Sequence, residues 1–130
     1  MSQQNIEYQT PVLLVTHPGR IQDGLRALLR TIPKVGTIYQ AADGASASQI
    51  ILKNHPALVL LDSKLSQIDI ANISSQLKTI APDTRCILMV DNMHQQTNDP
   101  LPHVDTVLLS GFSAWDFLMT VEKLLSTEIV

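Results

Sequence analysis

The sequence has little of what would mark a secreted, nucleic-acid-binding or membrane-spanning protein. It holds a single cysteine, Cys86, among 130 residues, so an internal disulfide is excluded and a buried thiol in a reducing compartment is expected. Nine basic against twelve acidic residues give a net charge of -3, without a basic stripe of the kind that binds nucleic acid. No apolar run approaches the length of a membrane span. We therefore expect a cytoplasmic protein that binds neither nucleic acid nor membrane directly.

What is present is the composition of a globular domain. Hydrophobic residues make up 45% of the chain and charged residues 16%, and 130 residues suffice for one hydrophobic core. Residues 1–10 are polar and lack the basic and apolar regions of a signal peptide, so they predict a flexible N-terminal tail. We expect one domain over residues 11–130.

Short apolar runs alternate along the chain with segments of helical spacing. Strands are predicted over 12–15, 35–41, 57–62, 85–90 and 104–109, and helices over 19–31, 43–54, 69–80 and 113–126. The first strand is apolar without alternation, which indicates burial on both faces. Alternating strands and helices predict right-handed βαβ units. The expected fold is therefore α/β, a flavodoxin-like doubly wound five-stranded parallel sheet in a three-layer α/β/α arrangement.

The segment 91–103, DNMHQQTNDPLPH, interrupts this alternation. It has two prolines, many turn-forming residues and no apolar stripe, so the fourth helix is predicted to be short or missing. The other helices have apolar stripes, and Ser113 is an expected N-cap for the last one. The stripe residues are Ile21, Leu25, Leu28 and Leu29; Ala47, Ile50 and Ile51; Ile70, Ile73, Leu77 and Ile80; and Phe117, Leu118, Val121, Leu124 and Leu125.

One acid, Asp62, ends the apolar run LVLLD of the third predicted strand. In an open parallel sheet, ligands bind at the carboxyl ends of the strands, near the point where the strand order reverses. The residues that follow the strands and should meet at this edge are Thr16, His17, Asp62, Val90, Asp91 and Ser110. The sequence therefore places its candidate functional site around Asp62.

Four segments together resemble the receiver domain of two-component response regulators, the CheY-like family. They are PVLLVTHP (11–18), AADGASA (41–47), LVLLDSKLSQID (58–69) and VDTVLLSGFSAWDFLMTVEKLL (104–125), and the resemblance covers residues 11–126. It implies a bacterial protein of phosphorelay signal transduction rather than an enzyme. It also implies that Asp62 stands at the phosphoacceptor position and that a histidine kinase or an output domain is a partner.

The family's other site residues are replaced in this sequence. The positions that normally hold two metal-binding acids, then a serine or threonine, then a lysine, are occupied by Thr16 and His17, by Val90 (or Asp91 if the register slips by one), and by Ser110. Two accessory positions differ as well, since Ser66 replaces a proline and Val107 replaces an aromatic residue. The resemblance therefore implies an atypical, degenerate receiver.

These replacements change the expected chemistry. Mg²⁺ prefers oxygen ligands that usually include carboxylates, and Thr16 and His17 offer a hydroxyl and an imidazole instead. Phosphoryl transfer depends on positioning and on neutralising charge at the transferred group. We therefore expect Mg²⁺ binding to be weak or absent, no other cofactor, and phosphorylation of Asp62 to be impaired or absent.

Five alternatives stay open for the same edge. Asp62 could be a working phosphoacceptor in an unusual site, or simply an acid at a strand end that caps a nearby turn. His17, Asp62 and Asp91 could form a transition-metal site, or the edge could bind a small ligand. Ser110 with His17 could suggest nucleophilic catalysis, but no orienting acid or oxyanion hole is evident.

Phe112, Trp115 and Met119 lie at the start of the last predicted helix and are candidates for a protein interface. Trp115 falls off the apolar stripe of that helix, so it either covers the edge of the core or serves as an exposed aromatic anchor. A homodimer through the last helix would use it in the second way.

Overall fold

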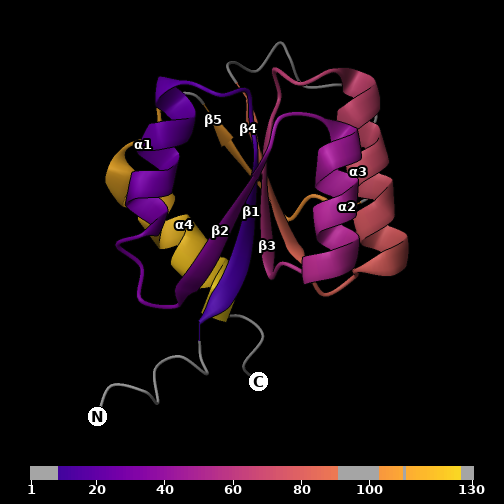
Figure 1. The fold of residues 1–130 in the computed structure, drawn as a ribbon. Coiled ribbons are helices and arrows are strands. Elements are labelled where there is room, and N and C mark those ends of the chain that lie inside the picture. Colours follow the sequence, from indigo (N-terminus) through magenta and orange to yellow (C-terminus); the bar gives the residue numbers. More distant parts are fainter. Residues whose placement is uncertain (1–8, 91–102, 110, 127–130) are drawn as a thin grey trace.

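The computed structural model describes residues 9–90, 103–109 and 111–126, and they form a five-stranded parallel sheet with two helices on each face (Figure 1). The elements are β1 (Thr10–Val15), α1 (Arg20–Leu29), β2 (Val35–Ala41), α2 (Gly44–Asn54), β3 (Leu58–Asp62), α3 (Gln67–Ile80), β4 (Arg85–Val90), β5 (Thr106–Leu109) and α4 (Ala114–Ser126). The strand order is β2-β1-β3-β4-β5, so the order reverses between β1 and β3. The predicted doubly wound fold is confirmed.

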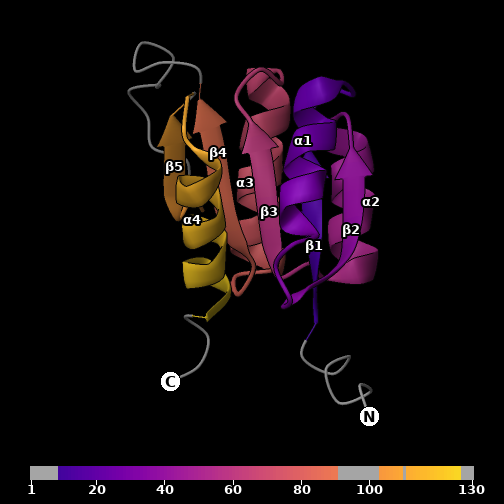
Figure 2. The same ribbon diagram turned by 90° about the vertical axis from the view of Figure 1, so that its left-hand side faces the viewer.

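The helices divide into two pairs. Helices α1 and α4 lie side by side on one face, as Figure 2 shows, and α2 and α3 cover the other. Strand β1 illustrates why both faces need cover, because Val12 and Leu14 belong to the core under α1 and α4 while Leu13 and Val15 belong to the core under α2 and α3. All four side chains are fully buried. This double burial accounts for the unbroken apolar run of the sequence.

Two residues of the predicted helix stripes are not in the core. Ile21 is 61% exposed, and the neighbouring Gln22 is buried in its place with Leu25 and Leu29. Ile80 is 50% exposed because it is the last residue of α3, and the following Ala81 packs against the core instead. The remaining stripe residues are buried or partly buried as predicted.

Element boundaries also differ in places from those predicted. Strand β1 begins at Thr10, whose N–H donates to the Lys34 carbonyl, and α3 begins at Gln67 after a Ser66 cap. Strand β5 begins only at Thr106, and the preceding Asp105 bonds to Cys86 of β4 through both its side chain and its backbone N–H. The predicted loop 91–103 lies outside the described residues except for His103, as do residues 1–8 of the predicted tail.

Three helices begin with a side-chain cap. Asp43 accepts from the N–H of Ser46, Ser66 from that of Asp69, and the predicted Ser113 cap from that of Asp116. Cys86 is fully buried, as expected, and burial raises the pKa of its thiol far above the ordinary value. No helix in the described part of the chain is long and apolar enough to cross a membrane.

Candidate functional site

Asp62 ends β3 at the carboxyl edge of the sheet and is half-buried. Its carboxylate accepts a hydrogen bond from the backbone N–H of Lys64 at 2.9 Å, and its carbonyl accepts one from Leu65 at 3.1 Å. The N–H of Ser63 donates across to the carbonyl of Met89 at 2.8 Å, which ties this turn to β4. Asp62 therefore caps the turn that follows its strand.

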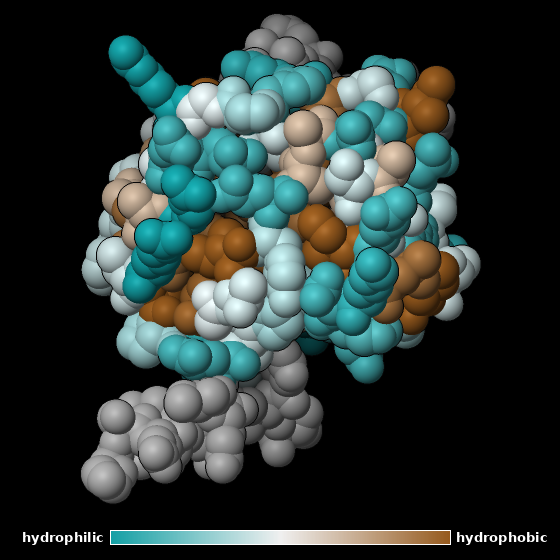
Figure 3. All heavy atoms as spheres, in the orientation of Figure 1, coloured by the Kyte–Doolittle hydropathy of each residue, from teal (hydrophilic) through white to brown (hydrophobic). Residues whose placement is uncertain are grey.

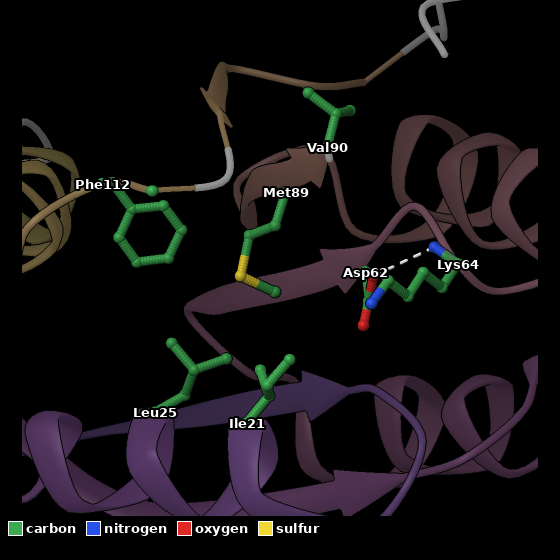
Figure 4. Close-up of a pocket in the computed structure, with 8 residues that line it drawn as sticks. Ile21, Leu25, Asp62, Lys64, Met89, Val90 and Phe112 are labelled. Carbon is green, nitrogen blue, oxygen red and sulfur yellow. Dashed lines mark hydrogen bonds between the residues drawn. The ribbon is translucent and has the colours of Figure 1, made fainter. Parts of the chain in front are cut away.

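A pocket of about 200 Å³ opens beside Asp62 at this edge. Figure 4 shows Ile21 and Leu25 pointing from α1 toward Met89, with the Phe112 ring on one side and Asp62 on the other. The full lining consists of Ile21, Leu25, Asp62, Lys64, Met89, Val90, Gly111 and Phe112. Asp62 is thus the one carboxylate among the described residues that line this pocket, and most of the wall is apolar.

The side chain of Lys64 runs back toward Asp62 in Figure 4. It is exposed and supplies the cationic group of the pocket lining. The pocket therefore carries one acidic and one basic side chain at its rim, against an apolar wall.

Thr16 and His17 follow β1, as predicted, but neither lines the pocket. Thr16 is 1% exposed, and its hydroxyl oxygen accepts a hydrogen bond from the Gln22 side-chain amide at 3.1 Å. The side chain of His17 is exposed. The hydroxyl at the first family position is therefore already engaged within the protein.

Val90 lies where it was predicted, at the end of β4, and lines the pocket with 2% exposure. Asp91 and Ser110 lie outside the described residues. The transition-metal alternative and the pairing of Ser110 with His17 both involve these residues. In the ranges 9–90, 103–109 and 111–126, no cluster of three or more His, Cys, Asp and Glu side chains could hold a metal ion.

Among the described residues, the donor set around Asp62 does not fit the Mg²⁺ ion that a receiver-like fold implies. Mg²⁺ requires near-octahedral oxygen coordination, usually with carboxylates. Within the described chain, Asp62 supplies one carboxylate, the Thr16 hydroxyl is bonded to Gln22, and the facing wall is made of Ile21 and Met89.

Two roles at this edge were not predicted from the sequence: Ile21 as a pocket wall and Gln22 as a buried polar group. The buried positions of α1 are 22, 25 and 29, which is as regular a helical spacing as the predicted stripe beginning at 21. Because Gln22 is polar, the sequence indicated that Ile21 rather than Gln22 faces the core. A polar residue at a helix position that fits the core spacing was the signal available.

Strand order 2-1-3-4-5 with helices on both faces defines a flavodoxin-like fold of the CheY-like receiver type. None of the known protein-family models matches the sequence. The solved receiver domain of an HD domain-containing protein from Pseudomonas fluorescens Pf-5 is similar, with a TM-score of 0.77, 21% identity and coverage of 92% of this chain and 97% of that one. The likeness establishes the fold.

Two further proteins are similar to this chain. The receiver domain of a sensor histidine kinase from Pseudomonas aeruginosa PAO1, solved with a magnesium ion coordinated in its active-site cleft, has a TM-score of 0.76 and 16% identity, and the match covers 90% of this chain and 98% of that one. Sporulation initiation phosphotransferase F of Bacillus subtilis (strain 168) is 40% identical over 70 residues, 52% of this chain and 56% of the relative. The chain thus matches about half the length of this curated relative.

Proposed function

We propose that this chain is a receiver domain of two-component phosphorelay signalling that acts through contacts with other proteins, with phosphorylation of Asp62 impaired or absent. The receiver-type fold and the sequence similarity to a sporulation phosphotransferase support the signalling role. The observation that carries the second part is the pocket beside Asp62, whose described lining holds one carboxylate and a largely apolar wall.

The physical reason lies in charge. A phosphoryl group that approaches a carboxylate brings several negative charges, and catalysis consists largely of positioning and neutralising them. Lys64 is the cationic side chain in the described pocket lining, and the Thr16 hydroxyl is bonded to Gln22. Without a well-coordinated metal ion, the charge at the transition state is poorly compensated.

Incubation with acetyl phosphate and Mg²⁺ followed by intact-mass measurement tests this proposal. We expect no stoichiometric gain of a phosphoryl group. Asp62→Asn serves as the site control, and Asp69→Asn is a matched control because Asp69 lies in the first turn of α3 at the same edge. A stoichiometric gain in mass of one phosphoryl group that is lost in Asp62→Asn and kept in Asp69→Asn would show that phosphorylation of Asp62 is not impaired.

A working phosphoacceptor is the second candidate. The 40% identity over 70 residues to a protein named as a phosphotransferase favours it, and so does the position of Lys64 beside Asp62. If it is correct, Lys64→Gln should slow phosphoryl incorporation strongly, whereas Lys53→Gln, an exposed lysine in the last turn of α2, should not.

A small-ligand module at the same edge is a further candidate, favoured by the pocket of about 200 Å³. A ligand that binds only the folded state must raise the melting temperature. Thermal unfolding with a panel of nucleotides and divalent ions would detect it, and Asp62→Ala should abolish a genuine shift at this pocket. No shift across the panel counts against this candidate.

We also propose a contact surface on α4, made of Trp115 and Met119. Trp115 is 69% exposed and Met119 is 47% exposed. More generally, the face of the molecule in Figure 3 shows apolar side chains in separate groups between hydrophilic ones. Phe112, the third predicted member, instead packs on the core with its ring 5.8 Å from that of Phe117. Large exposed aromatic residues are typical anchors of protein interfaces.

A homodimer through α4 is the partner we expect for this surface. Light scattering after size exclusion should show a dimer that Trp115→Ala disrupts. Leu52→Ala should leave the dimer intact, because Leu52 is an exposed apolar residue on α2, away from the proposed surface. A monomer for wild type and both variants at high concentration would contradict it.

A further inference from the structure

Helix α1 begins differently from the other three helices. Asp43, Ser66 and Ser113 cap α2, α3 and α4 with their side chains. The residue before α1 is Gly19, with φ 152°, and it provides no side-chain cap. Glycine is tolerated at a helix start, but it leaves the first N–H groups of α1 without a side-chain acceptor. Other contacts near the start of α1 can therefore contribute to holding it in place.

Gln22 provides such a contact from the first turn of α1. Its side-chain amide donates to the hydroxyl of Thr16 at 3.1 Å and lies 3.5 Å from the carbonyl of the same residue. Both partners are buried, Gln22 with 8% and Thr16 with 1% exposure, and the Thr16 N–H donates to the carbonyl of Ala41 at 3.1 Å. Thr16 therefore joins α1 to the ends of β1 and β2 through uncharged groups.

The pair lies directly beside the candidate site. Val15 is the register partner of Leu61, so Thr16, just after β1, lies level with Asp62, the last residue of β3. Neighbouring strands are about 4.8 Å apart. The position next to the Asp62 backbone is thus filled by a neutral, hydrogen-bonded pair.

Gln22 also sets the face that α1 presents to the pocket. Successive helix residues are rotated by about 100°. With Gln22 turned inward to Thr16, Ile21 is turned outward over the pocket at 61% exposure, and Leu25 follows on its wall. A helix in the predicted phase would bury Ile21 and remove this wall.

We infer that Gln22 and Thr16 form a neutral latch, which holds α1 on the carboxyl edge and shapes the Asp62 pocket in one state that is independent of divalent cations. This inference rests on the proposed receiver function of the edge. Gln22 is a positioning residue in this account, because it acts on the pocket through Ile21 and Leu25.

A double-mutant cycle tests the latch itself. Thr16→Val and Gln22→Leu each leave a buried polar group without its partner, and each should raise the unfolding equilibrium constant about tenfold. The double variant should be much less destabilised than the product of the two effects, because both polar groups are removed together. Thr16→Ser keeps the hydroxyl and should remain close to wild type. Additive effects in the cycle would overturn the latch.

A second readout separates positioning from stability alone. Methyl NMR signals of Ile21 and Met89 report the pocket, and we expect one set of signals that millimolar MgCl₂ leaves unchanged. Gln22→Leu should shift or split them. Gln76→Leu is the matched control, because Gln76 on α3 also donates from its side chain, to the carbonyl of Ser48. If Gln22→Met, a milder substitution, and Gln22→Leu both leave the Met89 and Ile21 signals in place, the positioning role is wrong.

The two proposals fail separately. Stoichiometric phosphorylation of wild type would refute impaired chemistry at Asp62 without altering the coupling between Thr16 and Gln22. An additive cycle would refute the latch without showing that Asp62 accepts phosphate. Selective movement of the Ile21 and Met89 signals on addition of Mg²⁺ would overturn the cation independence of the edge.

Discussion

Two buried threonines lie at opposite ends of the strands and make different contacts. We call these ends the amino edge, where the parallel strands begin, and the carboxyl edge, where they end. At the amino edge, just before β4, the hydroxyl of Thr84 donates to the carbonyl of Pro56 at 2.7 Å. At the carboxyl edge, the hydroxyl of Thr16 accepts from the Gln22 side chain at 3.1 Å. The first bond ties together the entries of two adjacent strands, and the second places a helix over a pocket.

The surroundings of the two threonines extend this difference. At the amino edge, His103 Nε2 lies 2.7 Å from the Thr84 carbonyl, and Asp105 accepts from the N–H of Cys86 at 2.8 Å and approaches Arg85 at 3.6 Å. At the carboxyl edge near α1, the polar groups give way to an apolar wall around Asp62. Hydrogen bonds and an ion pair thus stabilise the amino edge, whereas the carboxyl edge keeps an accessible surface where such folds bind their ligands.

The largest effect that should separate the two edges is at Asp105. Asp105→Ala leaves the Cys86 N–H without its acceptor and removes the ion pair with Arg85, which should cost about 2 kcal/mol of unfolding free energy. Asp62→Ala at the carboxyl edge should cost less than about 1 kcal/mol, because its acceptor role lies in an exposed turn. Urea denaturation measures both. Equal losses would show that the two edges do not differ in how strongly their carboxylates stabilise the fold.

Within the carboxyl edge, the side covered by α2 and α3 is closely packed at Gly44. A Cβ on Gly44 would lie 2.6 Å from the Asp69 carboxylate, so Gly44→Ala should destabilise the fold by about 1.5 kcal/mol. Gly24→Ala in α1 is the matched control. It meets nothing within 4 Å and should stabilise by about 1 kcal/mol through helix propensity. Two effects of the same sign in chemical denaturation would contradict this view.

Thr84 offers a smaller test of the amino edge. Thr84→Val preserves the shape of the side chain and removes its bond to Pro56, so the expected loss is about 1 kcal/mol. Thr84→Ser retains the hydroxyl and should lose less. Thermal unfolding of both variants measures the difference, and equal losses would show that the hydroxyl bond is not what Thr84 contributes.

The smallest effect is the pH dependence of the Asp43 cap at the carboxyl edge. The N–H of Ser46 donates to the Asp43 carboxylate and lowers the pKa of this carboxyl below its ordinary value of 3.8. The resulting stability is complete above the unfolded pKa and is lost as pH falls through the lower folded pKa. Wild type should therefore lose stability relative to Asp43→Asn only below about pH 4. If the melting temperatures of wild type and Asp43→Asn differ by the same amount at pH 7 and below pH 4, the Asp43 carboxylate does not contribute this pH-dependent stability.

The strands and the place of Asp62 could be predicted because they follow from burial. A strand covered on both faces must be apolar throughout, so the apolar runs Val12–Val15 and Leu58–Leu61 were predicted as strands. The acid that follows the second run indicated the carboxyl edge. Gln22 could not be predicted in the same way. It is a polar side chain in a buried position, and only the tertiary partner Thr16 makes that favourable.

Other features depend on contacts between segments far apart in sequence. The sequence indicates that Gly44 opens a helix but not that Asp69 packs against it, and it gives no sign that Asp105 bonds to the backbone of Cys86. The exposure of Ile21 follows from the phase that Gln22 imposes on α1. Pairwise contacts of this kind decide the shape of the pocket, whereas the periodicity of the sequence decides its place in the fold.

We expect that no divalent cation binds at the carboxyl edge beside Asp62. Mn²⁺ shares the oxygen-ligand preference of Mg²⁺ and broadens the NMR signals of nearby nuclei, so a Mn²⁺ titration of ¹⁵N-labelled protein tests it directly. We predict that the amide signals of Asp62, Ser63 and Lys64 broaden no more than those of the exposed acids Asp83 and Asp116. Selective, saturable broadening at Asp62 that Mg²⁺ competes away would show that a divalent cation binds there.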